Sequence, residues 1–300
     1  MKNMIEFYYN IKIESLQNNN TTYLFNIGNK EFIFKQYNNN PTIVEDIYKL
    51  NNYLRNSIPI DKIITNKYNT PLTIIDNTPY ILLLKKTQRN ITLVDISNMS
   101  NINPISIKTL ERNNWETLWS NKIDYYEMQI IENKKKYPLI RESFDYFVGL
   151  AENAISYLVN TKKENTPTIH DSKVISHNNI FNSIYDPSNI ILDHKARDIA
   201  EYIKISFFKN NYQIFKELDI YFKYNFYSIY GIRILFSRIL YPSFYFELYD
   251  NIINEKKEEK ELNKIISKIN DYEIYLYNIY QYLRKYYNIP SIEWIKKTRN

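Results

Sequence analysis

The first third of the chain carries apolar residues with the two-residue period of β-strands. Five runs rich in β-branched and aromatic side chains stand between polar breaks. They are residues 23–27, 31–37, 62–64, 72–75 and 80–84. The first two flank Gly28-Asn29-Lys30, a turn sequence typical of a hairpin. The last run is continuous enough to be a buried strand, so the pattern predicts a small sheet.

One helix is predicted between the second and third of these strands. Over residues 41–56 the apolar positions have helical spacing, at Ile43, Ile47, Leu50 and Leu54. Thr42 and Glu45 have the spacing of a capping box, in which each side chain bonds the backbone of the other residue. The predicted order is strand, strand, helix and then three strands.

The rest of the chain is mostly helical in pattern. Apolar stripes at three- to four-residue spacing run through residues 104–135, 142–160 and 262–283, and the whole chain after Asp198 is predicted to be helical. Residues 168–194 are irregular, with short apolar pieces at 174–175 and 190–192. The predicted fold class is therefore α+β and bilobal, like that of protein kinases. Residues 1–86 form a small β-rich N-terminal lobe with an antiparallel sheet and one helix, and residues 87–300 form a larger helical lobe.

Composition narrows the chemistry. The chain has no cysteine, three histidines and three glycines among 300 residues, which excludes disulfides, thiolate metal sites and glycine-rich phosphate loops. No apolar run reaches the roughly 18 residues of a membrane span, and the N-terminus lacks the pattern of a secretory signal. The net charge of +6 permits an acidic partner, but no recognised motif or basic stripe indicates nucleic acid. The 30 tyrosines reflect either codon bias or a binding surface, and the sequence leaves this open.

Lys35 is the first candidate functional residue. It lies within the strand EFIFKQY, so the alternation of the strand directs it away from the face that holds Phe34. In a kinase-like lobe that lysine neutralises nucleotide phosphates, whereas the alternative is an ordinary solvent-facing lysine. Glu45 is either the helix carboxylate that orients Lys35 or a capping residue.

Four segments resemble the YutH family of spore coat-associated proteins, which are relatives of CotS-type coat proteins and, more distantly, of aminoglycoside and choline phosphotransferases. Together they cover about a third of the chain, all in the helical lobe. They are ESFDYFVGLAENAISYLVNT (142–161), VISHNN (174–179), LDHKARDIAEYIK (192–204) and ILFSRILYPSFYFELYDNI (234–252). The resemblance implies the aminoglycoside-phosphotransferase variant of the protein-kinase fold.

The resemblance also implies roles for single residues. Active relatives carry H-G-D-x-x-x-x-N, followed later by a metal-binding aspartate. Here His177 takes the histidine position and Asn179 the position of the catalytic aspartate. The position of the metal-binding asparagine falls on Ser183 or Ile184, so that residue is lost as well. Asp193 takes the position of the late metal aspartate.

Two of these residues are expected to have structural roles. His177 is expected to bond the backbone of the catalytic loop. Asp198 matches the structural aspartate of a D-[LI]-A element and is expected to cap a helix and anchor the loop. Lys35 and Asp193 are then vestigial nucleotide and metal positions, and Asp193 is the sole candidate metal ligand.

Since an asparagine cannot act as a general base near neutral pH, and the candidate phosphate loop at residues 16–21 has no glycine, these residues predict a pseudokinase. No catalytic residue and no cofactor is expected, with residual binding of ATP and Mg²⁺ as the alternative. The resemblance implies a structural or assembly role among other spore coat proteins, in the cytoplasm of a sporulating cell and then on the spore coat. The alternative is a small-molecule phosphotransferase that uses Mg-ATP with a relocated base, at Asp171 or Asp186.

Overall fold

The computed structural model describes residues 1–86, 90–133, 135–180 and 183–297. The chain forms two compact units. The first unit comprises Met1–Arg112 and Lys173–Asp193, and the second comprises Asn113–Ser172 and His194–Asn300. The lobe boundary at residue 86 stays a prediction, and the first unit also contains the loop segment that carries His177 and Asn179.

The first unit is built on an antiparallel sheet. Its strands are β1 (Gln17–Asn19), β2 (Thr22–Ile27), β3 (Lys30–Gln36), β4 (Lys62–Ile64), β5 (Thr73–Ile75) and β6 (Thr78–Leu84). Their order is β1-β2-β3-β6-β4, and β5 also pairs with β6. The five predicted strands are confirmed. The pattern did not predict β1, because its three residues are polar and exposed and carry no apolar period.

Two tight turns join the first three strands. Ile27 pairs with Lys30, which leaves Gly28 and Asn29 as the turn, and Gly28 has a φ of +57° that favours glycine. The β1–β2 turn is formed by Asn20 and Thr21, with Asn20 at a φ of +57°. Asparagine tolerates this left-handed conformation better than other side-chain-bearing residues, so the turn between β1 and β2 forms without glycine.

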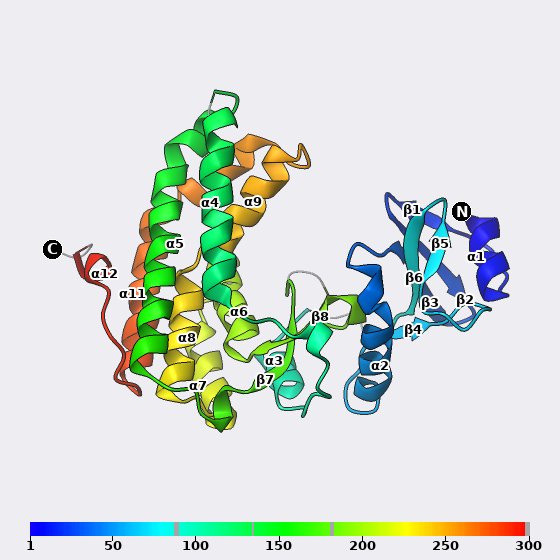
Figure 1. The fold of residues 1–300 in the computed structure, drawn as a ribbon, viewed down its shortest axis with the longest axis horizontal. Helices are drawn as coiled ribbons and strands as arrows, with labels where there is room; N and C mark the ends of the chain where they lie inside the picture. The colour runs from blue at the N-terminus through cyan, green and yellow to red at the C-terminus, as the bar shows by residue number, and fades with distance from the viewer. Residues whose placement is uncertain (87–89, 134, 181–182, 298–300) are drawn as a thin grey trace. The chain divides into compact units, whose positions relative to one another are not determined.

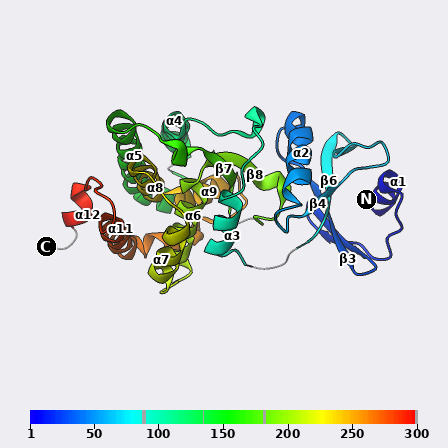
Figure 2. The same ribbon diagram turned by 90° about the horizontal axis from the view of Figure 1, so that it is seen from below.

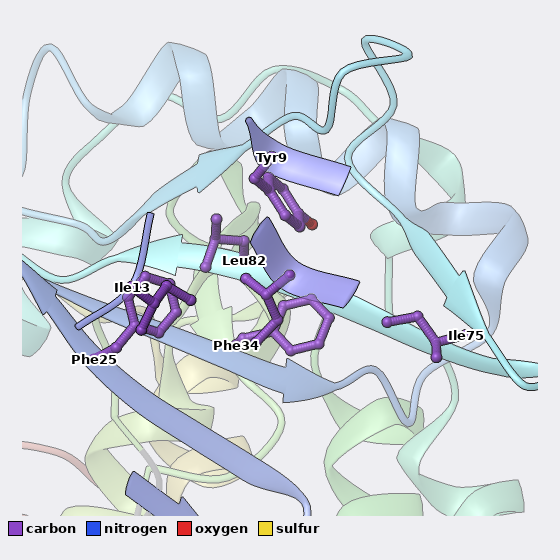
Figure 3. Packing of buried hydrophobic residues seen from close by; sticks show 7 residues of the cluster. Tyr9, Ile13, Phe25, Phe34, Ile75 and Leu82 are labelled. Atoms are coloured by element: carbon purple, nitrogen blue, oxygen red, sulfur yellow. The ribbon is translucent and has the colours of Figure 1, made fainter. Parts of the chain in front are cut away.

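One face of the sheet is covered by the N-terminal helix α1 (Lys2–Tyr9) and the segment that follows it. Figure 3 shows Tyr9 and Ile13 lying against side chains of the strands. Phe34 is fully buried at the centre of this cluster, and its ring stacks on that of Tyr80 at a centroid distance of 4.9 Å. The cluster fixes which face of β3 is apolar.

Helix α2 (Val44–Leu54) follows a short 3-10 turn at Pro41–Ile43. Ile47, Leu50 and Leu54 of the predicted stripe are buried in it, whereas Ile43 precedes the helix and is only partly buried. The predicted capping box is wrong. The helix has no side-chain cap, and Asn40 instead caps the 3-10 turn by accepting the Thr42 N–H at 3.0 Å. The buried Asn51 ties α2 to β4, because its amide accepts Ile63 N–H at 3.0 Å and donates to Asp61 O at 2.7 Å. Figure 2 shows α2 beside β4.

Among its described residues, the rest of the first unit contains helix α3 (Leu93–Ser100), 3-10 turns at Lys108–Leu110 and Pro187–Asn189, and the strand pair β7 (Lys173–His177) and β8 (Ile190–His194). β8 contributes its residues up to Asp193 to this unit. The two apolar pieces predicted at 174–175 and 190–192 therefore form a two-stranded sheet.

The second unit is helical (Figure 1). Its helices are α4 (Trp115–Asn133), α5 (Pro138–Glu164), α6 (Ala196–Phe208), α7 (Ile214–Tyr224), α8 (Ile229–Leu240), α9 (Ser243–Ile253), α10 (Asn263–Ile266), α11 (Ile269–Arg284) and α12 (Glu293–Lys297). Helix α8 packs against α5 and α6 and is buried from Gly231 to its end. The stripe predicted over 262–283 is divided, since α10 ends at Ile266 and α11 starts at Ile269.

A buried ionic cluster joins α6, α8 and the start of α9. Lys204 is 2% exposed, and its Nζ donates to Glu201 Oε1 at 3.0 Å, to the carbonyls of Arg238 and Tyr241, and to Ser243 Oγ at 2.6 Å. Arg238 lies 3.1 Å from the same Glu201 carboxylate. Burial alone would raise the pKa of Glu201, but Lys204 and Arg238 outweigh it and hold this pKa below its ordinary value of 4.5.

We expect Glu201→Gln to lower the free energy of unfolding by about 3 kcal/mol at pH 7, because it leaves two buried cations with one neutral partner. The carboxylate has a depressed pKa in the folded state, so its stabilisation is present above pH 4.5 and is lost as the pH falls towards the folded value. The difference between wild type and variant in urea unfolding should therefore shrink on acidification below pH 4.5.

Glu116→Gln is the matched control. In the same unit, Glu116 accepts a hydrogen bond from Lys162 at 3.1 Å, and both side chains are more than a third exposed. Loss of this exposed pair should lower the free energy of unfolding by less than about 1 kcal/mol. Equal effects of the two substitutions would contradict a special role for the buried cluster.

Candidate functional site: the lysine of β3 and the loop between β7 and β8

Lys35 leaves the sheet on the face opposite to the apolar cluster. It pairs across the sheet with Thr22 and Ile81, while its neighbour Phe34 is buried among the residues of Figure 3. Successive residues of a strand point to opposite faces. The Lys35 side chain has the orientation that the alternation predicts, and 22% of it is exposed.

The partner of Lys35 is Asp186, from the loop between β7 and β8. Lys35 Nζ donates to Asp186 Oδ2 and to Ser188 Oγ, the latter at 2.8 Å. Asp186 Oδ1 in turn accepts the backbone N–H of Ser188 at 3.0 Å and its hydroxyl at 2.7 Å. Asn39 Nδ2 donates to Ser188 O at 2.6 Å. The lysine and the loop are therefore joined by one closed set of hydrogen bonds.

A second carboxylate, Asp61, interacts electrostatically with the same pair. It is 3% exposed, and its Oδ1 accepts the backbone N–H of Lys86 at 2.9 Å. Burial raises the pKa of Asp61 to about 6, and repulsion from Asp186 adds to the rise. Lys35 therefore has two carboxyl groups among its electrostatic neighbours, Asp186 and Asp61.

Glu45, the other candidate partner of Lys35, is exposed at the start of α2. Among the described residues, the ion pair that Lys35 forms is with Asp186. The hypothesis that Glu45 orients Lys35 is therefore wrong, and so is its role in a capping box. Glu45 still lies in the first turn of α2, where a negative charge is favourable.

The loop after β7 is held by side chains that bond its backbone. His177, at the end of β7, is 1% exposed, and its Nε2 lies 3.0 Å from Ile184 O. Asn189 Oδ1 accepts the Asn179 N–H at 3.1 Å, and Asn189 Nδ2 donates to Asn179 O at 2.7 Å. The His177 contact is of the kind that the resemblance implies, and the two asparagines close the loop on itself.

Asp193 and Asp198 are both buried, at 3% exposure. Asp193 is the fourth residue of β8, which pairs with the strand that carries His177. Asp198 is the third residue of α6, so the prediction that it caps this helix is wrong. The first N–H of α6, from Ala196, is accepted by His194 Nδ1 at 3.1 Å instead. Asp198 remains close enough to the helix start to meet the positive end of its dipole.

Asp171, one of the two candidate relocated bases, is fully bonded within the second unit. Its carboxylate accepts the N–H and hydroxyl of Thr168, the hydroxyl of Ser228, and a bond from His194 Nε2 at 3.4 Å. A Cβ at Gly231 would lie 2.6 Å from Asp171 Oδ1, so only glycine allows this approach. Burial alone would raise the pKa of Asp171, but these bonds hold it well below its ordinary range. Such a carboxylate is a weak base.

The contacts of Asn39, Ser188 and Asn189 were not predicted. Asp186-Pro187-Ser188-Asn189 is a strong turn sequence, and that signal could have located the 3-10 turn Pro187–Asn189. Nothing in the sequence distinguishes Asn39 or Asn189 from the many other asparagines of the chain. Their partners are 149 and 10 residues away along the chain.

Two solved structures define the class of the fold. An aminoglycoside phosphotransferase from Alicyclobacillus acidocaldarius superposes with a TM-score of 0.62 at 10% identity, over 95% of this chain and 97% of the other. The AMP complex of spectinomycin phosphotransferase APH(9)-Ia has a TM-score of 0.58 at 16% identity, over 87% of this chain and 93% of the other. The protein therefore has an aminoglycoside phosphotransferase-like kinase fold, with a β-sheet N-terminal lobe and a helical C-terminal part.

The family is established by sequence. The model of the family described as spore coat putative kinase YutH matches residues 2–279, so the chain belongs to the YutH family. It is similar to the endospore coat-associated protein YutH of Bacillus subtilis (strain 168), with 29% identity over 221 residues. That alignment spans 65% of this chain and 65% of the length of the relative.

Two further findings concern the described residues. None of their helices combines the length and the apolar character that a membrane crossing requires. Within the same part of the chain, no three histidine or carboxylate side chains gather in a way that could hold a metal ion.

We expect Asp198→Ala to lower the urea midpoint clearly and Asn179→Ala to change it little. Asp198 is buried in the first turn of α6, where the helix dipole favours its negative charge, so replacing it removes a stabilising interaction of up to about 2 kcal/mol. Asn179 is partly exposed, and its backbone keeps both bonds to Asn189 when its side chain is shortened. A neutral Asp198→Ala together with a severe Asn179→Ala would show that the loop has been assigned in the wrong register.

Proposed function

We propose that this YutH-family protein is a catalytically silent kinase-fold protein that serves as a structural or assembly component of the spore coat. The observation that carries the proposal is the amide chemistry of the loop after His177. The residue proposed for the position of the general base is Asn179, and the backbone of Asn179 is bonded on both sides by Asn189.

An amide cannot do the work of a carboxylate in phosphoryl transfer. The base must accept a proton from the substrate hydroxyl, whereas the amide of Asn179 is not basic and its NH₂ group is a donor. The proposed positions of the metal-binding asparagine, Ser183 or Ile184, carry no carboxamide or carboxylate either. Asp193 alone would remain for the metal, and Mg²⁺ usually needs a second ligand together with the substrate phosphates.

The residues that would contact a nucleotide, in the β1–β2 turn and at Lys35, also favour a silent protein. The β1–β2 turn, at Asn20 and Thr21, contains no glycine. Lys35 is bonded by Asp186 and Ser188. We therefore assign Lys35 and Asp193 to vestigial nucleotide and metal positions and expect no bound cofactor.

We infer the role in the spore coat from the family to which the chain belongs. The relative that it resembles is named as endospore coat-associated. We propose that the protein acts in the cytoplasm of a sporulating cell, becomes part of the spore coat, and has other coat proteins as its partners.

The competing function is a Mg-ATP-dependent small-molecule phosphotransferase with its base at Asp171 or Asp186. Both carboxylates are already bonded by neighbouring donors, Asp171 by Thr168 and Ser228 and Asp186 by Lys35. For Asp171 these bonds hold the pKa well below its ordinary range, so this carboxylate has little tendency to take a proton from a substrate.

We expect no phosphoryl transfer from Mg-ATP to an aminoglycoside, to choline or to a serine peptide. Loss of a general base commonly costs about 10²–10⁴ in rate, so turnover should lie at least a hundredfold below the usual kinase value of about 1 s⁻¹. The measurement is ADP release by purified protein, with an active aminoglycoside phosphotransferase as the positive control. Turnover near 1 s⁻¹ would reject the proposal.

We also expect millimolar Mg-ATP to leave the melting temperature almost unchanged. A ligand at about 100 times its dissociation constant would stabilise the fold by about 2.7 kcal/mol, which is easily seen. Differential scanning fluorimetry with ATP, with and without Mg²⁺, makes the test. A Mg-dependent shift that disappears in Lys35→Ala would demonstrate a working nucleotide site.

A further inference from the structure

A pocket of about 350 Å³ lies between the C-terminal parts of α7 and α11, within the helical second unit. Small-molecule sites usually have volumes of about 300–1,000 Å³ and mostly apolar walls with a few polar groups. None of the residues that line this pocket belongs to β3 or to the loop between β7 and β8. They are Asp219, Phe222 and Lys223 of α7, Tyr282 and Leu283 of α11, and Tyr286 and Tyr287 just beyond it.

Aromatic rings form much of the wall. The ring centroid of Tyr282 lies 6.3 Å from that of Phe222 and 5.8 Å from that of Tyr286, with interplanar angles of 34° and 67°. The three rings therefore border the pocket at different inclinations. Tyr282 and Leu283 are buried, whereas Tyr286 is 65% exposed, so the pocket is closed on its inner side and open at Tyr286. Such a wall favours a flat apolar group, because aromatic rings pair well in offset or edge-to-face contact.

One polar group of the pocket is a carboxylate with an oxygen to spare. Asp219 is exposed on α7, and its Oδ1 accepts the Tyr282 hydroxyl at 2.8 Å. Burial and this bond raise the pKa of Tyr282, so its hydroxyl stays protonated and remains a donor. Among the described residues, no hydrogen bond or ion pair reaches the second oxygen, Oδ2. That oxygen is available to an ammonium group of a ligand.

The other polar group carries the opposite charge. Lys223 is exposed four residues after Asp219, and residues at this spacing share one face of a helix. Within the part of the chain that the structure describes, the two side chains form no ion pair with each other, and the Lys223 ammonium group has no hydrogen-bond partner. A purely cationic ligand would be repelled by Lys223 and a purely anionic one by Asp219. A ligand that carries both charges is attracted by both residues.

We propose that this pocket binds a free α-amino acid with an aromatic side chain. Asp219 accepts bonds from the ammonium group of the ligand, and Lys223 donates to its carboxylate. The ligand's ring lies against Phe222 and Tyr286. An α-amino acid fits both the charges and the wall, because one carbon atom carries its two charged groups and its apolar side chain. The inference goes beyond the proposed function, since binding at α7 and α11 needs neither phosphoryl transfer nor a partner protein.

Three probes separate the contributions of the two charges. L-phenylalanine carries both charged groups, 3-phenylpropanoate lacks the ammonium group, and phenethylamine lacks the carboxylate. In isothermal titration calorimetry of the full-length protein, we expect L-phenylalanine to bind at least about tenfold more tightly than either analogue, the factor of one charge-assisted hydrogen bond. Equal affinities for the three probes, or no binding of L-phenylalanine at millimolar concentration, would overturn the proposal.

Two substitutions of exposed side chains assign each charge to its residue. Asp219→Asn keeps an oxygen for the Tyr282 hydroxyl and should weaken binding of L-phenylalanine about tenfold, without weakening that of 3-phenylpropanoate. Lys223→Met should weaken L-phenylalanine by a similar factor without weakening phenethylamine. Tyr286→Ala should weaken all three probes, because they share the ring that it contacts. If both charge variants fold and keep the wild-type affinity for L-phenylalanine, the pocket is not the proposed site.

Lys216→Met is the matched control. Lys216 is exposed on α7, three residues before Asp219, and does not line the pocket. The substitution removes the same charge from the same helix as Lys223→Met and should leave the affinity for L-phenylalanine unchanged. An equal loss in the two lysine variants would show that the effect reflects net charge alone and would reject the site. None of these results depends on turnover, so catalytic silence keeps its own separate test.

Discussion

The two-residue alternation of β3 is the constraint on which both the core and the candidate site of the first unit depend. Phe34 must enter the apolar cluster beneath α1, and this burial fixes the face on which Lys35 emerges. A register shift of one residue would bury an ammonium group and expose a phenyl ring. The same hydrophobic contacts that stabilise the sheet therefore hold the lysine in reach of the loop between β7 and β8.

Neutral polar groups bond the part of that loop that follows His177. The amide of Asn189 bonds the backbone of Asn179 on both sides, and His177 reaches the carbonyl of Ile184. Active kinases place a metal ion, a carboxylate base and a nucleotide in the equivalent region. In this chain the described contacts of Asn179 and His177 within the loop are made by the chain's own side chains and backbone.

The two units differ in how deeply their ion pairs are buried. In the second unit, Lys204 finds acceptors for all of its protons and shares Glu201 with Arg238, so the charges of this cluster are paired inside the helical core. In the first unit, Lys35 and Asp186 are only partly buried. Partial exposure makes the second pair a weaker contributor to stability.

The sequence by itself determined the main strands of the sheet, the helix between β3 and β4 and the helical character of the second unit, because periodicity and turn residues are local signals. It also determined the family, through segments that resemble those of its members. It also predicted the face of β3 on which Lys35 lies. It failed for α1 and β1, for the capping of α2 and α6, and for the partner of Lys35. Capping depends on which of several nearby polar side chains reaches the helix start, as His194 does for α6. The partner of Lys35 is 151 residues distant along the chain. Only the tertiary structure decides that Asp186, rather than Glu45, lies beside the ammonium group, because no local sequence pattern shows which distant carboxylate will lie next to a given strand.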